Sequence, residues 1–164
     1  MLPTARTIGV MIDLSSLLSA FMTRTICPGA LSGLTRLSGG ANMESWAFDW
    51  AGSGYVLRRA PSADYMAGRP HGHADEAALV IAAHGAGVKA PEVVGVLVVS
   101  DGMGTGYVMR RVIAEVNPAK ILADPPSSLL ADLGRELARI HAIPAATIPA
   151  AIPLMDTAAA LAEL

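Results

Sequence analysis

Two adjacent glycines, an arginine and a glutamate have the types and spacing of a phosphate-binding site. Gly39 and Gly40 lie between two strand-like runs, where a backbone without side chains can approach an anion closely. Arg58 lies in the next strand-like run, and Glu76 begins a helix-like segment from which its carboxylate could hold the guanidinium. The pattern predicts a glycine turn that covers the phosphates of a nucleotide and a cation that neutralises their charge.

The strand around Arg58 indicates which side chains face this site. Successive residues of a strand point to opposite faces, so Val56 and Arg58 share one face while Arg59 points to the other. We expect Val56 to pack against the base and Arg58 to reach the phosphates. Ser38 and Asn42 flank the glycine pair, and their side chains could also contact phosphate oxygens.

The elements that must position these residues predict an α+β fold. Hairpin-linked strands with a crossing helix favour a five-stranded antiparallel sheet with helices at both ends of the chain. Residue types, together with the glycines, prolines and capping residues that bound each element, predict strands at residues 31–37, 45–50, 55–59, 93–99 and 106–112. They predict helices at residues 14–21, 76–84 and 129–140, and another after Asp156.

Composition excludes several classes of partner. The chain has 164 residues and a formal net charge of -2, which gives no electrostatic reason to expect nucleic acid. No uncharged run reaches the roughly 18 to 20 residues that a membrane helix needs. The single cysteine, Cys27, excludes an intramolecular disulfide and a cysteine-based metal site, and it fits a reducing cytoplasm.

Three further stretches carry a resemblance to a known family. Residues 87–93 read like a link from a helix to a fourth strand, residues 104–109 like a fifth strand entering a hinge, and residues 133–141 like the helix after that hinge. From residue 37 to residue 141 the sequence resembles the N-terminal lobe of aminoglycoside-phosphotransferase-like kinases, near the subgroup associated with acyl-CoA dehydrogenases. The resemblance implies an N-terminal helical segment (1–30), a protein-kinase-like small lobe (31–112), and a hinge, linker and start of a helical lobe (113–164).

The resemblance also implies ATP-dependent transfer of phosphate to a hydroxyl group of a small molecule. Met109, Arg110 and Val112 would then lie at the hinge, where backbone groups of Arg110 and Val112 would hydrogen-bond the adenine edge. Arg58 would neutralise phosphate charge and Glu76 would orient it. The sequence departs from the family in having Arg110 where a carboxylate or small polar residue is common. The acceptor stays open among aminoglycoside, choline-like, sugar-like and hydroxyacyl compounds.

The largest departure from the family is the lack of a His-Gly-Asp sequence followed by a downstream asparagine. In the family, this part of the large lobe supplies the catalytic base and the ligands of magnesium. We therefore expect no catalytic residue and no metal ligand in these 164 residues, and Mg²⁺ only together with the missing lobe. The chain is expected to be inactive alone, as a fragment, a truncated product or half of a split protein.

Two other functions remain open. The sequence from Asp101 to Gly106 contains Gly-x-Gly-x-Gly, and Asp124 lies about twenty residues further on, which would suit NAD(P) binding. The β-prone residues 107–109 and the prolines at 118 and 125 favour a hairpin turn there instead. A non-catalytic protein-interaction module is the second alternative, because the apolar composition and the leucine stripe of residues 129–140 suggest a surface for docking or self-association.

Three histidines could suggest metal ligands, at positions 71, 73 and 84. No cysteine or clustered carboxylate lies near them in the sequence to complete a coordination sphere. Structural roles are therefore the preferred interpretation of these three side chains.

Overall fold

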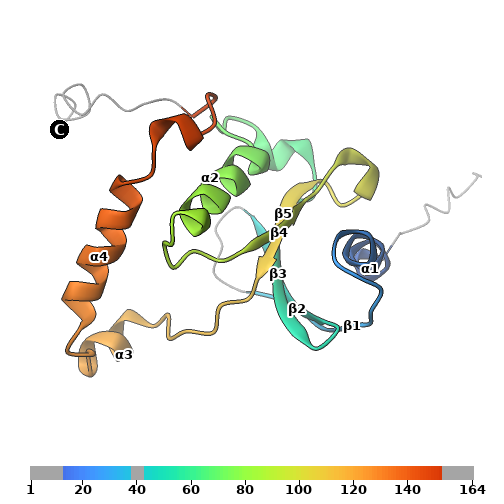
Figure 1. Cartoon of the computed structure of the whole chain (residues 1–164). Helices are drawn as coiled ribbons and strands as arrows, with labels where there is room; N and C mark the ends of the chain where they lie inside the picture. The colour runs from blue at the N-terminus through green and yellow to red at the C-terminus, as the bar shows by residue number, and fades with distance from the viewer. Residues whose placement is uncertain (1–12, 38–42, 153–164) are drawn as a thin grey trace, which may run out of the picture.

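Five antiparallel strands form one sheet in the order β1-β2-β3-β5-β4. The computed structural model describes residues 13–37 and 43–152 (Figure 1). Its strands are β1 (Leu31–Arg36), β2 (Glu44–Trp50), β3 (Ser53–Ala60), β4 (Val93–Val96) and β5 (Thr105–Arg110), and its helices are α1 (Leu14–Thr25), α2 (His73–Gly85), α3 (Pro118–Ala123) and α4 (Leu129–His141).

Local sequence signals explain the first elements. Asp13 caps α1, because its carboxylate accepts a hydrogen bond from the backbone N–H of Ser15. Ala51 and Gly52 join β2 to β3 with φ angles of 48° and 79°. Positive φ at both positions is the geometry of the two-residue turn that matches the twist of paired strands.

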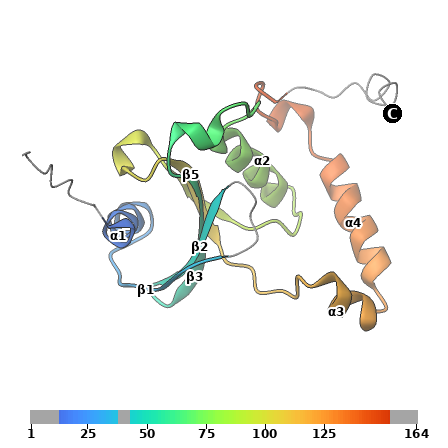
Figure 2. The ribbon, with the colours of Figure 1, turned by 180° about the vertical axis from the view of Figure 1, so that it is seen from behind.

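Helices cover the two faces of the sheet unequally. Figures 1 and 2 show α1 against one face and α2 against the other. The hydrophobic core lies on the α1 side, where Leu18, Phe21 and Met22 of the helix are buried. The sheet and its connections supply the other buried members, which are Phe48, Trp50, Tyr55, Leu57, Leu97, Met103 and Val108.

Strand β4 ends at Val96, before the predicted end at residue 99, because the chain turns into a 3-10 helix at Val99–Asp101. Asp101 fixes this turn: its Oδ2 accepts from the N–H of Val98 at 2.8 Å, and its Oδ1 lies 2.8 Å from Nη1 of Arg24 in α1. Gly102 and Gly104 then adopt positive φ before β5 begins. The preference for a turn over a dinucleotide-binding loop is therefore confirmed, since β5 pairs antiparallel with β4.

The region after β5 also differs from the prediction. Residues expected as linker form α3, in which Pro118 occupies the first turn and Asn117 caps it by accepting from the N–H of Ala119 at 3.0 Å. Helix α4 follows where predicted, with Ser128 as its N-cap residue. Within the described residues, no helix has the length and apolar character needed to cross a bilayer. The helix expected after Asp156 lies outside the described residues.

Candidate functional site

The register of β2, β3 and β5 arranges side chains in rows across the sheet. Two neighbouring rows on the α2 side of the sheet consist of Ser45, Arg58 and Tyr107, and of Ala47, Val56 and Met109. Arg59 belongs to the opposite face, where its Nη2 lies 2.9 Å from Oε2 of Glu44. The predicted division of Val56 and Arg58 from Arg59 is therefore confirmed.

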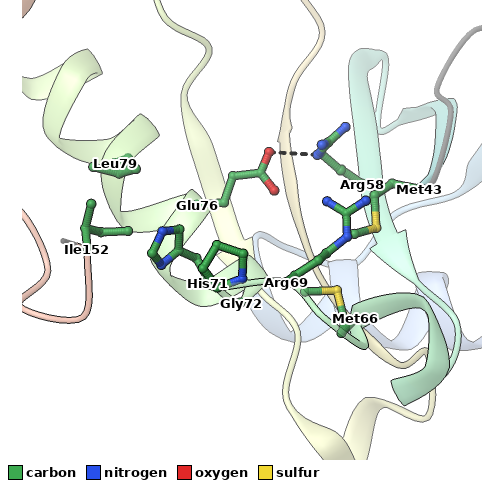
Figure 3. Close-up of a pocket in the computed structure, with 10 residues that line it drawn as sticks. Met43, Arg58, Met66, Arg69, His71, Gly72, Glu76, Leu79 and Ile152 are labelled. Carbon is green, nitrogen blue, oxygen red and sulfur yellow. Dashed lines mark ion pairs between the residues drawn. The ribbon is translucent and has the colours of Figure 1, made fainter. Parts of the chain in front are cut away.

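Arg58 and Glu76 form an ion pair between β3 and α2 (Figure 3). Nε of Arg58 lies 2.8 Å from Oε1 of Glu76, and both side chains are about one-third exposed, at 32% and 38%. The distance would suit a hydrogen bond, but the buried Nε of Arg58 has no hydrogen-bond partner. The contact is therefore an ion pair, in which the Nε–H bond of Arg58 does not point at the Glu76 carboxylate.

Tyr107 supports Glu76 from β5, and the sequence analysis did not identify it. Its phenol is buried beside the ion pair. Burial, the negative charge of Glu76 and a hydrogen bond with that carboxylate together raise the pKa of Tyr107 to about 12. The phenol is thus a neutral donor that helps to position Glu76. Its period-two spacing from Met109 on β5 is the only sequence signal that could have found it.

His73 anchors the beginning of α2 to β5. Its ring is 2% exposed, and its Nδ1 lies 3.0 Å from Oγ1 of Thr105. Burial lowers the pKa of His73, and the nearby Arg58 and Arg69 lower it further against the opposing effect of Glu76. A neutral imidazole therefore ties the helix that carries Glu76 to the sheet. Among the described residues, no group of three or more His, Cys, Asp or Glu side chains is placed to hold a metal ion.

A cavity of about 310 Å³ opens beside the Arg58–Glu76 pair (Figure 3). Arg69 and His71 line it from the loop before α2, and Met43 lines it from the beginning of β2. Met43 is the first described residue after the glycine pair. The predicted phosphate contacts Ser38, Gly39, Gly40 and Asn42 themselves lie outside the described residues.

The model of the phosphotransferase enzyme family APH matches residues 33–164, which is more than half of the chain. The chain belongs to this family. No curated protein matches its sequence.

Solved structures show that the chain has the fold of the N-terminal lobe in APH-family proteins. A candidate aminoglycoside phosphotransferase from Ralstonia eutropha JMP134 is 20% identical, with a TM-score of 0.50 over 63% of this chain and 29% of that chain. Aminoglycoside phosphotransferase APH(4)-Ia is 19% identical, with a TM-score of 0.50 over 79% of this chain and 40% of that chain. The chain thus spans less than half the length of either relative, and the predicted kinase-like small-lobe fold is confirmed.

The edge of the sheet at which β5 ends carries a second ion pair on the α2 side. Nη2 of Arg111 lies 2.6 Å from Oδ1 of Asp49, and its guanidinium crosses Gly54, where an added Cβ would lie 2.6 Å from Nε. The pattern of the sequence did not reveal this pair, because it depends on the register of three strands. Together, Arg58–Glu76 and Asp49–Arg111 flank the apolar row that contains Val56 and Met109.

The predicted adenine contacts at the hinge differ in their availability. The N–H of Arg110 donates to the carbonyl of Glu92 at 2.8 Å, so a contact between Arg110 and a base would have to use its carbonyl group. The guanidinium of Arg110 lies over the ring of Tyr55, on the α1 side of the sheet, with Cζ 4.8 Å from the ring centroid. Val112 follows the end of β5 and its side chain is exposed.

Proposed function

We propose that this chain is the ATP-binding small lobe of a small-molecule kinase that phosphorylates a hydroxyl acceptor. The observation that carries the proposal is the Arg58–Glu76 ion pair, which lies one row away from the apolar side chains of Val56 and Met109. The base would lie over the apolar row that contains Val56, and the phosphates would lie at the row that contains Arg58. The nucleotide would then run along the direction of the strand. Same-face rows are about 7 Å apart, which suits adjacent parts of one nucleotide.

Each residue would contribute a separate part of nucleotide binding. Val56 and Met109 would pack against adenine, while the carbonyl group of Arg110 and the backbone of Val112 would meet its edge. Arg58 would neutralise the phosphates with its permanent positive charge, while Glu76 holds its guanidinium in place. The backbone of Gly39 and Gly40, with the side chains of Ser38 and Asn42, would cover the phosphates from the other side.

Phosphoryl transfer also needs a base and metal ligands, and the sequence offers no His-Gly-Asp with a later asparagine to supply them. We therefore propose that the 164 residues bind ATP without transferring its phosphate. Magnesium and the acceptor would bind where those additional groups are present. The single exposed cysteine, Cys27, supports a reducing cytoplasm as the location.

A protein-interaction module is the second candidate function. The apolar stripe of α4 is open to solvent, with Leu130 83% exposed and Leu133 57% exposed. Leu137 and Ile140 continue the stripe. Such a face would suit docking to another polypeptide or to a second copy of the chain.

Calorimetric titration of the 164-residue chain with ATP, ADP and NAD distinguishes these functions. We expect ATP and ADP to bind and NAD to bind more weakly, with no phosphate released or transferred when magnesium and a range of alcohols are added. Binding of none of the three nucleotides would contradict the kinase-lobe proposal and favour the interaction module. Preference for NAD would favour a dinucleotide site, and turnover would show that catalytic groups are present after all.

A further inference from the structure

The Asp49–Arg111 ion pair links three strands at the edge of the sheet where β5 ends. Asp49 belongs to β2 and Arg111 directly follows β5, so the guanidinium of Arg111 crosses β3, which lies between them. It crosses at Gly54, and its Nη2 lies 2.6 Å from Oδ1 of Asp49. The backbone adds a second link, because the N–H of Arg111 donates to the carbonyl of Gly54 at 3.0 Å. Arg111 is therefore attached to the sheet through both its backbone and its side chain.

Glycines on the neighbouring strands leave room for this ion pair. A Cβ added at Gly54 of β3 would lie 2.6 Å from Nε and Nη2 of Arg111, which is too close for the guanidinium to stay in place. On the other side, a Cβ added at Gly33 of β1 would lie 3.1 Å from Oδ2 of Asp49. Gly33 has a φ angle of 62°, a conformation that favours glycine. At these two positions, β1 and β3 therefore present no side chain that competes for the space.

The ion pair lies one row away from the apolar side chains of Val56 and Met109. Gly54 precedes Val56 by two residues on β3, and residues two apart share one face of a strand. Arg111 stands in the same relation to Met109, so both belong to the α2 face. The ion pair between β3 and α2 lies one row away in the opposite direction. The apolar row therefore has an ion pair on each side, one anchored in α2 and one at the end of β5.

Arg111 also marks the boundary between the sheet and a segment without regular structure. Residues 111–117 form neither helix nor strand, and α3 begins only at Pro118. The side chains of Val112 and Ile113 are exposed, so little packing holds the backbone at the start of this segment. The position of Val112 therefore depends on the attachment of Arg111 to the sheet.

We propose that the Asp49–Arg111 pair positions the segment after β5 for contact with the base of the nucleotide. By attaching Arg111 to β2 and β3, the pair would hold the backbone of Val112 beside the apolar row before a ligand binds. A site that is already ordered loses less entropy on binding, so the pair would raise the affinity for the base. Asp49 and Arg111 are thus positioning residues. This role rests on the proposed function, because that function places a base over the apolar row.

Arg111→Gln and Asp49→Asn, alone and combined, test this role in the 164-residue chain, with ATP, adenosine and tripolyphosphate as probes. Each single variant should weaken the binding of ATP and adenosine by about three- to fivefold, the range for a partly exposed ion pair. Tripolyphosphate binding should not change, because the phosphates would meet the opposite side of the apolar row. The combined variant should lose no more affinity than either single one, since both substitutions remove the same interaction. Arg111→Lys should retain part of the affinity, because it keeps the charge without the planar fork.

Hydrogen exchange of the nucleotide-free chain tests the positioning without any ligand. The amide of Arg111, which donates to Gly54, should exchange about three- to fivefold faster in Asp49→Asn than in the wild type. The amide of Leu57 in β3 is the internal reference, because its side chain is fully buried, and its exchange should not change. Unchanged exchange at Arg111 would overturn the positioning role.

Arg24→Gln is the matched control, because Arg24 forms a similar ion pair with Asp101 at 2.8 Å, on the α1 side of the sheet. It should lower the melting temperature about as much as Arg111→Gln while leaving all three affinities unchanged. Adenosine affinity like that of the wild type in both single variants would overturn the positioning role, as would an equal loss of tripolyphosphate affinity, while ATP binding by the chain would stand. If the wild type binds neither ATP nor adenosine, the kinase-lobe proposal is wrong and the role in base binding falls with it. Faster exchange in Asp49→Asn would in that case still show that the pair holds the segment.

Discussion

Arg58 and Arg59 are neighbours in the sequence, yet they pair with carboxylates on opposite faces of the sheet. Arg58 lies 2.8 Å from Glu76 of α2, and Arg59 lies 2.9 Å from Glu44 of β2. The Glu44 carboxylate is partly buried, which alone would raise its pKa, but hydrogen bonds from Trp46 and Arg59 hold the pKa of Glu44 below its ordinary value. One arginine therefore borders the candidate site and the other stabilises the fold.

Replacing each arginine by alanine should separate these two roles. Arg58→Ala should weaken ATP binding by about ten- to a hundredfold, the range for a lost charged hydrogen bond. Arg59→Ala should lower the free energy of unfolding by about 1–3 kcal/mol, because it leaves Glu44 without its closest cation. Nucleotide titration and urea unfolding of both variants make the comparison. Equal losses of ATP affinity in the two variants would contradict the assignment of faces.

Tyr107→Phe should remove the hydrogen bond to Glu76 while keeping the ring in place. We expect a loss of about 1 kcal/mol in unfolding free energy and a severalfold weaker affinity for ATP, since Glu76 loses a positioning partner. Tyr55→Phe is the control, because Tyr55 is buried on the α1 side of the sheet. Stability loss without any change in ATP affinity would show that Tyr107 has only a structural role.

The pH dependence of stability provides a second test of Tyr107. Its pKa is raised to about 12 in the folded protein, so folding favours the neutral phenol. This contribution is fully present below the ordinary phenol pKa of about 10 and is lost as the pH rises from there through the folded value. Unfolding free energy between pH 10 and 12 should therefore fall more steeply in the wild type than in Tyr107→Phe. Parallel curves would contradict the raised pKa.

Asp101→Asn should weaken the link between the β4–β5 connection and α1. Burial alone would raise the pKa of Asp101, but hydrogen bonds from Arg24 and from the N–H of Val98 hold it below the ordinary value. A lowered carboxyl pKa stabilises the fold above the unfolded pKa, and this contribution is lost as the pH falls through the folded pKa. At pH 7 the free energy of unfolding of Asp101→Asn should be lower than that of the wild type by about 1–3 kcal/mol. As the pH falls into the acid range, the unfolding free energy of the variant should decrease less steeply than that of the wild type. Urea unfolding measures both effects.

Asp64→Asn is the control for this experiment, since Asp64 is an exposed carboxylate in the loop after β3. It should leave the acid part of the stability curve unchanged. If Asp101→Asn also follows the wild-type curve in acid, the charge of Asp101 contributes nothing to the junction with α1.

The sequence predicted elements whose signals are local. Period-two alternation around Arg58 assigned the faces of β3, and the helix predicted from residue 14 begins there as α1. The early end of β4 was not predicted: the turn that follows it combines a local hydrogen bond from the N–H of Val98 to Asp101 with an ion pair between Asp101 and Arg24, which lie far apart in the chain. Tyr107 was missed for a related reason: it meets Glu76 only because β5 pairs with β3 in one particular register.

Gly106→Ala should test how closely β3 and β5 must approach each other where Gly106 lies beside the backbone of Arg58. An added Cβ at Gly106 would lie 2.3 Å from the carbonyl oxygen of Arg58, which is backbone and cannot move without disturbing strand pairing. Gly54→Ala is the matched variant, because there the added Cβ would meet the guanidinium of Arg111, the flexible end of a side chain. Gly106→Ala should lower the unfolding free energy by about 1–3 kcal/mol or more, whereas Gly54→Ala should displace Arg111 from Asp49 at a smaller loss. Urea unfolding measures both, and a Gly106→Ala protein as stable as Gly54→Ala would show that the strands are not held this closely.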